Sequence, residues 1–90
     1  MLSGSRLSFR GITRAVFARL RKKAVRSGLT VVQPRGEAVR DGVRIQWEYD
    51  PAAEVLEIEC VHTPFWIDRA AVHRRLSHEI ESELEPERAA

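Results

Sequence analysis

The chain has a single cysteine, Cys60, in 90 residues, and no acidic residue precedes Glu37. One cysteine makes no internal disulfide, so nothing requires an oxidising compartment. No apolar run approaches the roughly 18 residues of a membrane span. No apolar stretch of roughly 7–15 residues follows the first arginine, which argues against a secretory signal. These absences favour one small cytoplasmic domain over residues 1–90, without a transmembrane segment.

Acidic and basic residues are separated along the chain. Residues 1–36 hold nine bases and no acid (+9), whereas residues 37–90 hold six bases and 13 acids (−7), which gives the net charge of +2. This split predicts either an anionic partner for the first part or pairing between the two parts. An arginine-rich, acid-free start is also typical of a mitochondrial transit peptide, in which case residues 1–28 direct the protein to mitochondria.

Helical spacing of apolar residues predicts a basic amphipathic helix over residues 8–26. Ser8 suits the N-cap and Gly28 the position after the C-terminus. The basic side chains lie outside the apolar arc, and the candidate binding residues on this helix are Arg10, Arg14, Arg21, Lys22 and Arg26. Residues 29–33 are a candidate edge strand that Pro34 ends, and residues 35–42 are predicted to form a loop.

Alternating apolar and polar residues predict a β-hairpin with strands 43–49 and 55–62. If Tyr49 faces Glu54, Trp47 lies opposite Leu56, and Arg44 lies opposite Glu59. A slide by two residues would keep the same faces but lose the pairing of Arg44 with Glu59. The apolar face of the hairpin carries Val43, Ile45, Trp47, Leu56, Ile58 and Cys60.

A second helix is predicted over residues 68–85, with Asp68 as N-cap. Its apolar stripe consists of Val72, Leu76, Ile80 and Leu84. Phe65, Trp66 and Ile67 precede it and are expected to pack the start of this helix onto the sheet. Residues 86–90 are expected to be disordered. The fold class is therefore α+β: an N-terminal helix, a two- or three-stranded antiparallel sheet and a C-terminal helix, with both helices on one sheet face.

The segment from Trp47 to Asp68 contains a hairpin and a Pro-Phe-Trp-Ile corner, and a helix follows it. It resembles small uncharacterised bacterial proteins that run helix, hairpin, Pro-Phe-aliphatic corner and terminal helix. Some of those are described as polyhydroxyalkanoate-system-like. The similarity covers about residues 45–80 and departs from the pattern at Trp66 and Asp68. It implies the hairpin-and-helix architecture and no catalytic residue.

Few side chains in the sequence suit catalysis or metal binding. Cys60 and His62 are two apart on a strand, about 6–7 Å at Cα, which is not the contact of a nucleophile with its base. His73 and His78 are five apart and point about 140° apart on a helix, so they do not easily chelate one ion. We therefore expect no catalytic residue, no metal, no cofactor and no enzymatic activity.

The sequence favours a small non-catalytic interaction module that binds a protein partner or a second copy through a sheet edge. The alternative is non-specific binding of nucleic acid or another polyanion by the basic helix. Against this alternative, Phe9 and Phe17 are needed for the core, and no exposed aromatic residue is interleaved with the arginines for base stacking.

Overall fold

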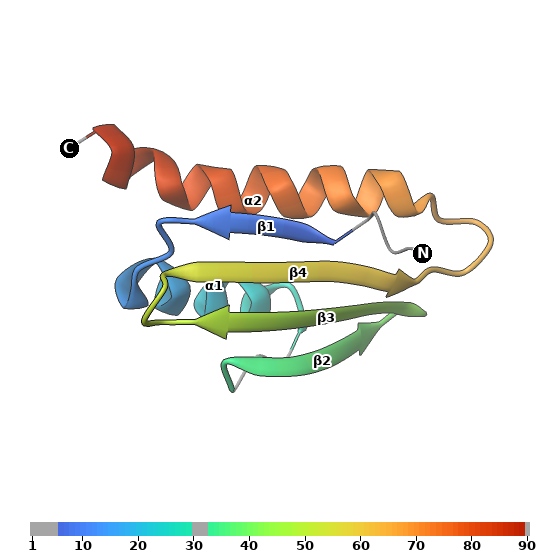
Figure 1. Ribbon diagram of the computed structural model, residues 1–90. Helices are drawn as coiled ribbons and strands as arrows, with labels where there is room; N and C mark the ends of the chain where they lie inside the picture. The colour runs from blue at the N-terminus through green and yellow to red at the C-terminus, as the bar shows by residue number, and fades with distance from the viewer. Residues whose placement is uncertain (1–5, 30–32, 90) are drawn as a thin grey trace.

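The computed structural model describes residues 6–29 and 33–89. Along the chain the elements are β1 (Leu7–Arg10), α1 (Arg14–Arg26), β2 (Arg35–Arg40), β3 (Val43–Asp50), β4 (Val55–His62) and α2 (Arg69–Ala89) (Figure 1). The strands form one antiparallel sheet in the order β1-β4-β3-β2. The expected α+β class with an antiparallel sheet and two helices is confirmed, whereas the expected two or three strands become four.

The first strand lies where the sequence predicts the start of a helix. Gly11 has a φ of 79°, which breaks a helical path, and α1 begins only after Thr13. The Thr13 side chain accepts a hydrogen bond from Val16 N at 3.2 Å, so Thr13 is the N-cap in place of Ser8. Residues 7–10 alternate between half-buried and exposed and pair with β4.

Strand β2 replaces the loop predicted over residues 35–42. It pairs with β3 across a two-residue turn in which Asp41 has a φ of 53° and Gly42 a φ of 81°. Two positive φ values are typical of the type I′ turn, whose twist matches that of a hairpin. Of the edge strand predicted at 29–33, residues 30–32 lie outside the described residues, and Leu29 and Gln33 belong to no strand.

The β3–β4 hairpin keeps the predicted faces but is shifted by two residues. Tyr49 lies opposite Leu56, and Trp47 lies opposite Ile58. The shift follows from the turn, because Asp50 Oδ1 accepts hydrogen bonds from the backbone N–H groups of residues 52 and 53 at 3.0 and 3.2 Å. Strand β3 therefore extends to Asp50, which pairs with Val55. The predicted register, with Trp47 opposite Leu56, is wrong.

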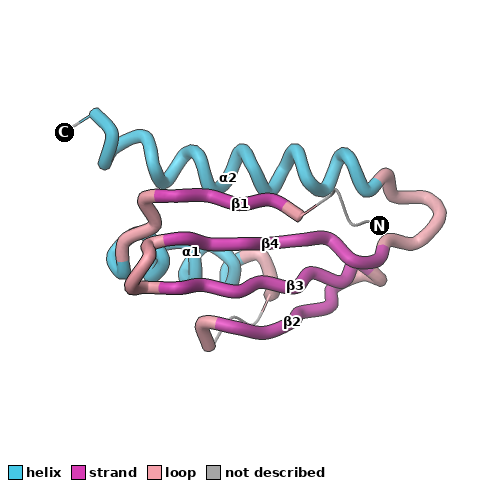
Figure 2. Tube along the Cα trace, in the orientation of Figure 1, coloured by secondary structure: helices cyan, strands magenta, loops and turns pink. Residues whose placement is uncertain are grey.

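One face of the sheet carries the core, and both helices cover it (Figures 1 and 2). The buried core residues are Ile12, Val16, Ala38, Ile45, Trp47, Tyr49, Leu56, Cys60, Ile80 and Leu84. Tyr49 joins α1 to the sheet, because its ring stacks on Phe17 at 4.2 Å and its hydroxyl donates to Ile12 O at 2.7 Å. The indole N–H of Trp47 donates to Gln33 O at 2.9 Å. The polar atoms of these buried aromatic side chains are therefore satisfied.

Helix α2 begins as predicted and ends later. Asp68 Oδ1 accepts a hydrogen bond from Ala70 N at 3.1 Å, which fits its predicted role as N-cap. The helix continues through Pro86 to Ala89, so the tail expected to be disordered from 86 is helical there, and residue 90 lies outside the described part. Pro86 removes one backbone N–H, but Leu84, only 2% exposed, anchors this end in the core.

Candidate functional site

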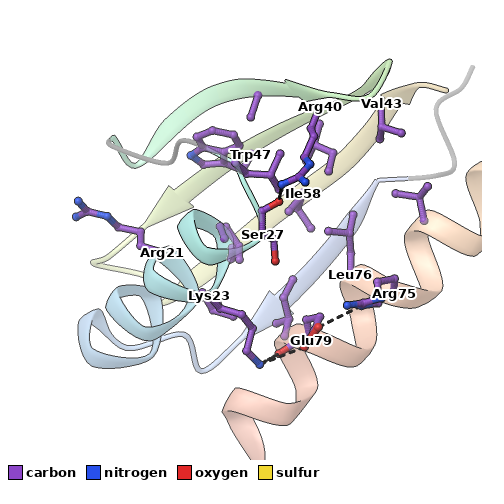
Figure 3. A pocket seen from close by; sticks show the side chains of 18 of the residues that line it. Arg21, Lys23, Ser27, Arg40, Val43, Trp47, Ile58, Arg75, Leu76 and Glu79 are labelled. Atoms are coloured by element: carbon purple, nitrogen blue, oxygen red, sulfur yellow. Dashed lines mark hydrogen bonds and ion pairs between the residues drawn. The ribbon is translucent and has the colours of Figure 1, made fainter. Parts of the chain in front are cut away.

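A groove of about 550 Å³ runs between the two helices, with the sheet as its floor (Figure 3). Trp47, Ile58 and Leu76 point into this space, whereas the Arg21 side chain points away from it. Its apolar lining includes Leu20 and Ala24 from α1, Val72, Leu76 and Ile80 from α2, and Val43, Trp47 and Ile58 from the sheet. Several of these residues are only half-buried, so the groove is an uncovered continuation of the core.

Ion pairs close the polar rim of the groove. Glu79 lies 3.2 Å from Lys23 Nζ and 3.1 Å from Arg75 Nε, and Lys23 Nζ also lies 3.0 Å from Glu83 (Figure 3 shows the Glu79 pairs). Arg40 of β2 donates a hydrogen bond to the backbone carbonyl of Ser27, at the end of α1. Within residues 6–29 and 33–89, every buried side-chain nitrogen or oxygen has a hydrogen-bond partner. The groove therefore offers mainly apolar surface, and the buried polar side-chain atoms around it are already hydrogen-bonded.

The rim pairs shift the pKa values of their members. The hydrogen bond from Lys23 lowers the pKa of Glu79 below its usual value, and Arg75 lowers it further. Lys23 lowers the pKa of Glu83 in the same way, with help from Arg19. The pKa of Lys23 is raised in return, chiefly by its hydrogen bond to Glu83. Lys23, Glu79 and Glu83 are thus charged and paired at neutral pH, and their ion pairs link α1 to the antiparallel α2 at this end of the groove.

The corner between β4 and α2 exposes two aromatic side chains beside the groove. Phe65 is 97% exposed and Trp66 is 68% exposed, and their rings meet edge to face at 5.1 Å. A turn closed by the hydrogen bond from Ile67 N to Pro64 O (3.0 Å) brings Ile67 into the groove lining instead. The expectation that Phe65, Trp66 and Ile67 pack the start of the helix onto the sheet is therefore wrong for Phe65 and Trp66, whereas Ile67 is half-buried.

The five predicted binding residues are divided between two elements. Arg10 lies on β1, with its side chain exposed, and not on the helix. Arg14, Lys22 and Arg26 are exposed on α1, and Arg21 lies at the groove rim. The structure does not bring all five together.

The α1 residues that pair with the acidic helix are ones that the prediction left out. Arg19 Nε lies 3.0 Å from Glu83, and Lys23 lies close to both Glu79 and Glu83. Each helix presents its charges four residues apart, Arg19 and Lys23 against Glu79 and Glu83. That matched spacing is the sequence signal that could have identified this contact.

The outer face of the sheet also pairs charges from the two parts of the chain. Arg6 lies 2.8 Å from Glu57, and Arg35 pairs with Glu48. Arg44 bonds to Glu37 at 2.6 Å across the β2–β3 hairpin, and both residues belong to the second part. Part of the charge split is therefore self-complementary, although exposed pairs of this kind contribute little to stability.

The thiol and imidazole groups do not form a reactive pair. Cys60 is buried, which raises the pKa of its thiol, and Sγ donates to the carbonyl of His62 at 3.5 Å and not to an imidazole. His73 Nε2 accepts a hydrogen bond from Cys60 N at 3.0 Å, and burial lowers the pKa of His73. In the described part of the chain, no three His, Cys, Asp or Glu side chains are grouped to hold a metal ion.

Among the helices of the described residues, none has the length and apolar character needed to cross a membrane. No protein-family model, curated protein or solved structure matches the chain.

Proposed function

We propose that the protein is a small non-catalytic interaction module, and that the groove between α1 and α2 is its binding site for a protein partner. The observation that supports this most is an apolar opening of about 550 Å³ whose rim charges are already paired. Binding sites commonly measure about 300–1,000 Å³ and are lined mainly by apolar side chains. Covering such surface contributes roughly 25 cal/mol per Å² of apolar area removed from water.

The chemistry of the groove favours an apolar protein segment as its occupant. Lys23 and Arg75 already bind Glu79, so a charged small molecule would have to displace an existing ion pair. Two helical walls over a sheet floor also suit a segment that inserts apolar anchors, as in helix-in-groove recognition. The buried, high-pKa thiol of Cys60 provides no nucleophile beside the groove, which supports a role without catalysis.

A peptide selection with a groove variant tests this proposal. A phage-displayed peptide library is selected on the wild-type protein and rescreened on Val72→Arg, which places a charge in the groove wall. Ala70→Arg is the matched control, because it adds the same side chain at an exposed position of the same helix. We expect peptides with apolar or aromatic anchors that bind the wild type and the control but not Val72→Arg. Peptides that bind all three equally, or no selectable peptide on a monomeric protein, would overturn the proposal.

The exposed basic side of α1 supports a second candidate function, non-specific binding of a polyanion. Arg14, Lys22 and Arg26 are exposed there, whereas Arg19 and Lys23 are the α1 residues that pair with Glu83 of α2. Such binding is dominated by phosphate contacts and weakens steeply as salt increases. Titration of labelled duplex DNA and RNA at two salt concentrations tests it, with charge reversal of the three residues and Arg74→Glu on α2 as control. Absence of binding at low salt would exclude this function.

A further inference from the structure

We infer that the partner of the groove is a second copy of this chain, and that each copy inserts its Phe65–Trp66 corner into the groove of the other. This inference rests on the proposed function of the groove and names its occupant. Three observations support it. The corner and the groove are adjacent, they would bury enough area for a dimer, and both are apolar.

The corner and the groove are adjacent, as a two-fold dimer requires, because its surface patch must complement itself. The projecting corner and the receiving groove lie in one patch: Ile67 lines the groove, and Trp66 and Phe65 precede it directly. A two-fold axis beside this patch would place the corner of each copy over the groove of the other. Both contacts would then form at once, and the assembly would close at two copies.

The area is sufficient for a stable dimer. Phe65 and Trp66 are the two most exposed large apolar side chains in the described part of the chain. An aromatic side chain buries roughly 150–250 Å². Four such side chains in two copies, with a similar area of groove surface, bury about 1,200–2,000 Å² in total, which is the range of standard protein–protein interfaces.

The chemistry of the corner matches that of the groove. The two rings meet edge to face at 5.1 Å and 86°, so together they form one apolar projection. The groove supplies apolar walls for these rings. In contrast, the exposed edge strand β2 carries Arg35 and Glu37, charges that discourage pairing through the sheet.

Sedimentation equilibrium over a concentration series tests the inference with variants that each remove one half of the contact. The Phe65→Ala/Trp66→Ala variant lacks the corner, and Val72→Arg blocks the groove. Because both aromatic residues are exposed, their removal leaves the core intact, which circular dichroism checks. We expect a wild-type dimer and a dissociation constant at least about 30-fold higher for each variant, the effect of losing a central aromatic anchor. Val25→Ala, at an apolar residue 60% exposed that is not among the groove lining, is the control and should leave the dimer unchanged.

A mixing experiment identifies the contact itself. A corner-deleted copy still has an intact groove, and a groove-blocked copy still has an intact corner, so the mixture can form one of the two contacts. We expect it to associate more tightly than either variant alone, with a blue shift of Trp66 emission. A dimer that survives both variants, or a mixture no tighter than its components, would overturn the inference.

The result also separates this inference from the proposed function. A monomeric wild type whose groove still selects peptides would overturn the second-copy inference and leave the binding function standing. A monomeric wild type that selects no groove-dependent peptide would overturn both.

Discussion

Two leucines of α2 provide a sharp test of the boundary between core and groove. Leu84 is 2% exposed and belongs to the core, whereas Leu76 is half-buried and forms part of the groove wall. Both lie on the same helix and lose the same atoms on substitution by alanine. Any difference between Leu84→Ala and Leu76→Ala in the free energy of unfolding therefore reports how each site is covered.

The expected losses follow from burial. Leu84→Ala loses the transfer free energy of the removed atoms and leaves a cavity in a closed core. Such substitutions lower the free energy of unfolding by roughly 2.7–5 kcal/mol. We expect about 3 kcal/mol. Full burial of a leucine side chain contributes about 1.5–3 kcal/mol. Leu76 realises only part of this contribution, and its removal enlarges a groove that is already open, so we expect about 1 kcal/mol.

Urea unfolding followed by the fluorescence of buried Trp47 measures both losses. The series is made in the Phe65→Ala/Trp66→Ala background, so that neither association nor the exposed indole contributes to the signal. An unchanged dependence on urea concentration would show that the variants differ in stability and not in the extent of unfolding. Equal losses for the two leucines, or a loss below about 1 kcal/mol for Leu84→Ala, would refute the assignment of core and groove.

Three further predictions follow from particular contacts. Because the folded pKa values of Glu79 and Glu83 are lowered from 4.5, their stabilisation is present above about pH 4.5 and is lost as pH falls through the folded values. In urea titrations at several pH values, the Glu79→Gln/Glu83→Gln variant should show a smaller fall in the free energy of unfolding at acidic pH than the wild type. An equal fall would contradict this prediction. The pKa of His73 is lowered from 6.5 by burial, so its contribution is present above about pH 6.5 and declines below it, and His73→Gln, which retains an acceptor for the Cys60 amide, should remove that decline. Gly42→Ala forces a side chain into a φ of 81° and should lower the free energy of unfolding by about 1–2 kcal/mol in the same assay; a neutral effect would argue against the type I′ turn.

The elements with strong periodicity could be predicted from the sequence. Strict alternation placed Ile45, Trp47, Leu56 and Cys60 on the inward face, and all four are buried. This prediction survived a register error of two residues, because side chains in a strand repeat every two positions and an even shift keeps them on the same face. The apolar stripe of α2 likewise identified Ile80 and Leu84 as inward-facing.

Three features were missed because a short local signal competed with a longer pattern. Apolar spacing extended the first helix back over Phe9, although Gly11 and Thr13 mark where a helix stops and starts. Charged residues made β2 look like a loop, whereas Asp41-Gly42 is a strong signal for a two-residue hairpin turn. The register depended on the Asp50 side chain bonding within the turn, which hydrophobic patterning does not encode.

The groove and its aromatic corner were hidden from the sequence for a different reason. Apolar periodicity shows which residues avoid the polar side of a helix, and it assigns Leu76 and Leu84 to the same stripe. The separation of the two helices over the sheet decides which of these two leucines is covered. That separation is a property of tertiary packing. Phe65 and Trp66 looked like core residues because large apolar side chains are usually buried.

Strand β1 has a consequence for the order in which the protein folds. Strands β2, β3 and β4 form a meander of neighbours, whereas β1 pairs with β4 between residues as far apart as Leu7 and Ile58. Closing that long loop costs chain entropy that the two hairpins do not face, and such non-local pairing slows folding. We expect the meander to form first and β1 to dock late, although β1 is synthesised earliest. Until then β4 presents an open edge and Phe9 an uncovered ring, so the nascent chain is most prone to aggregate just before its first strand pairs.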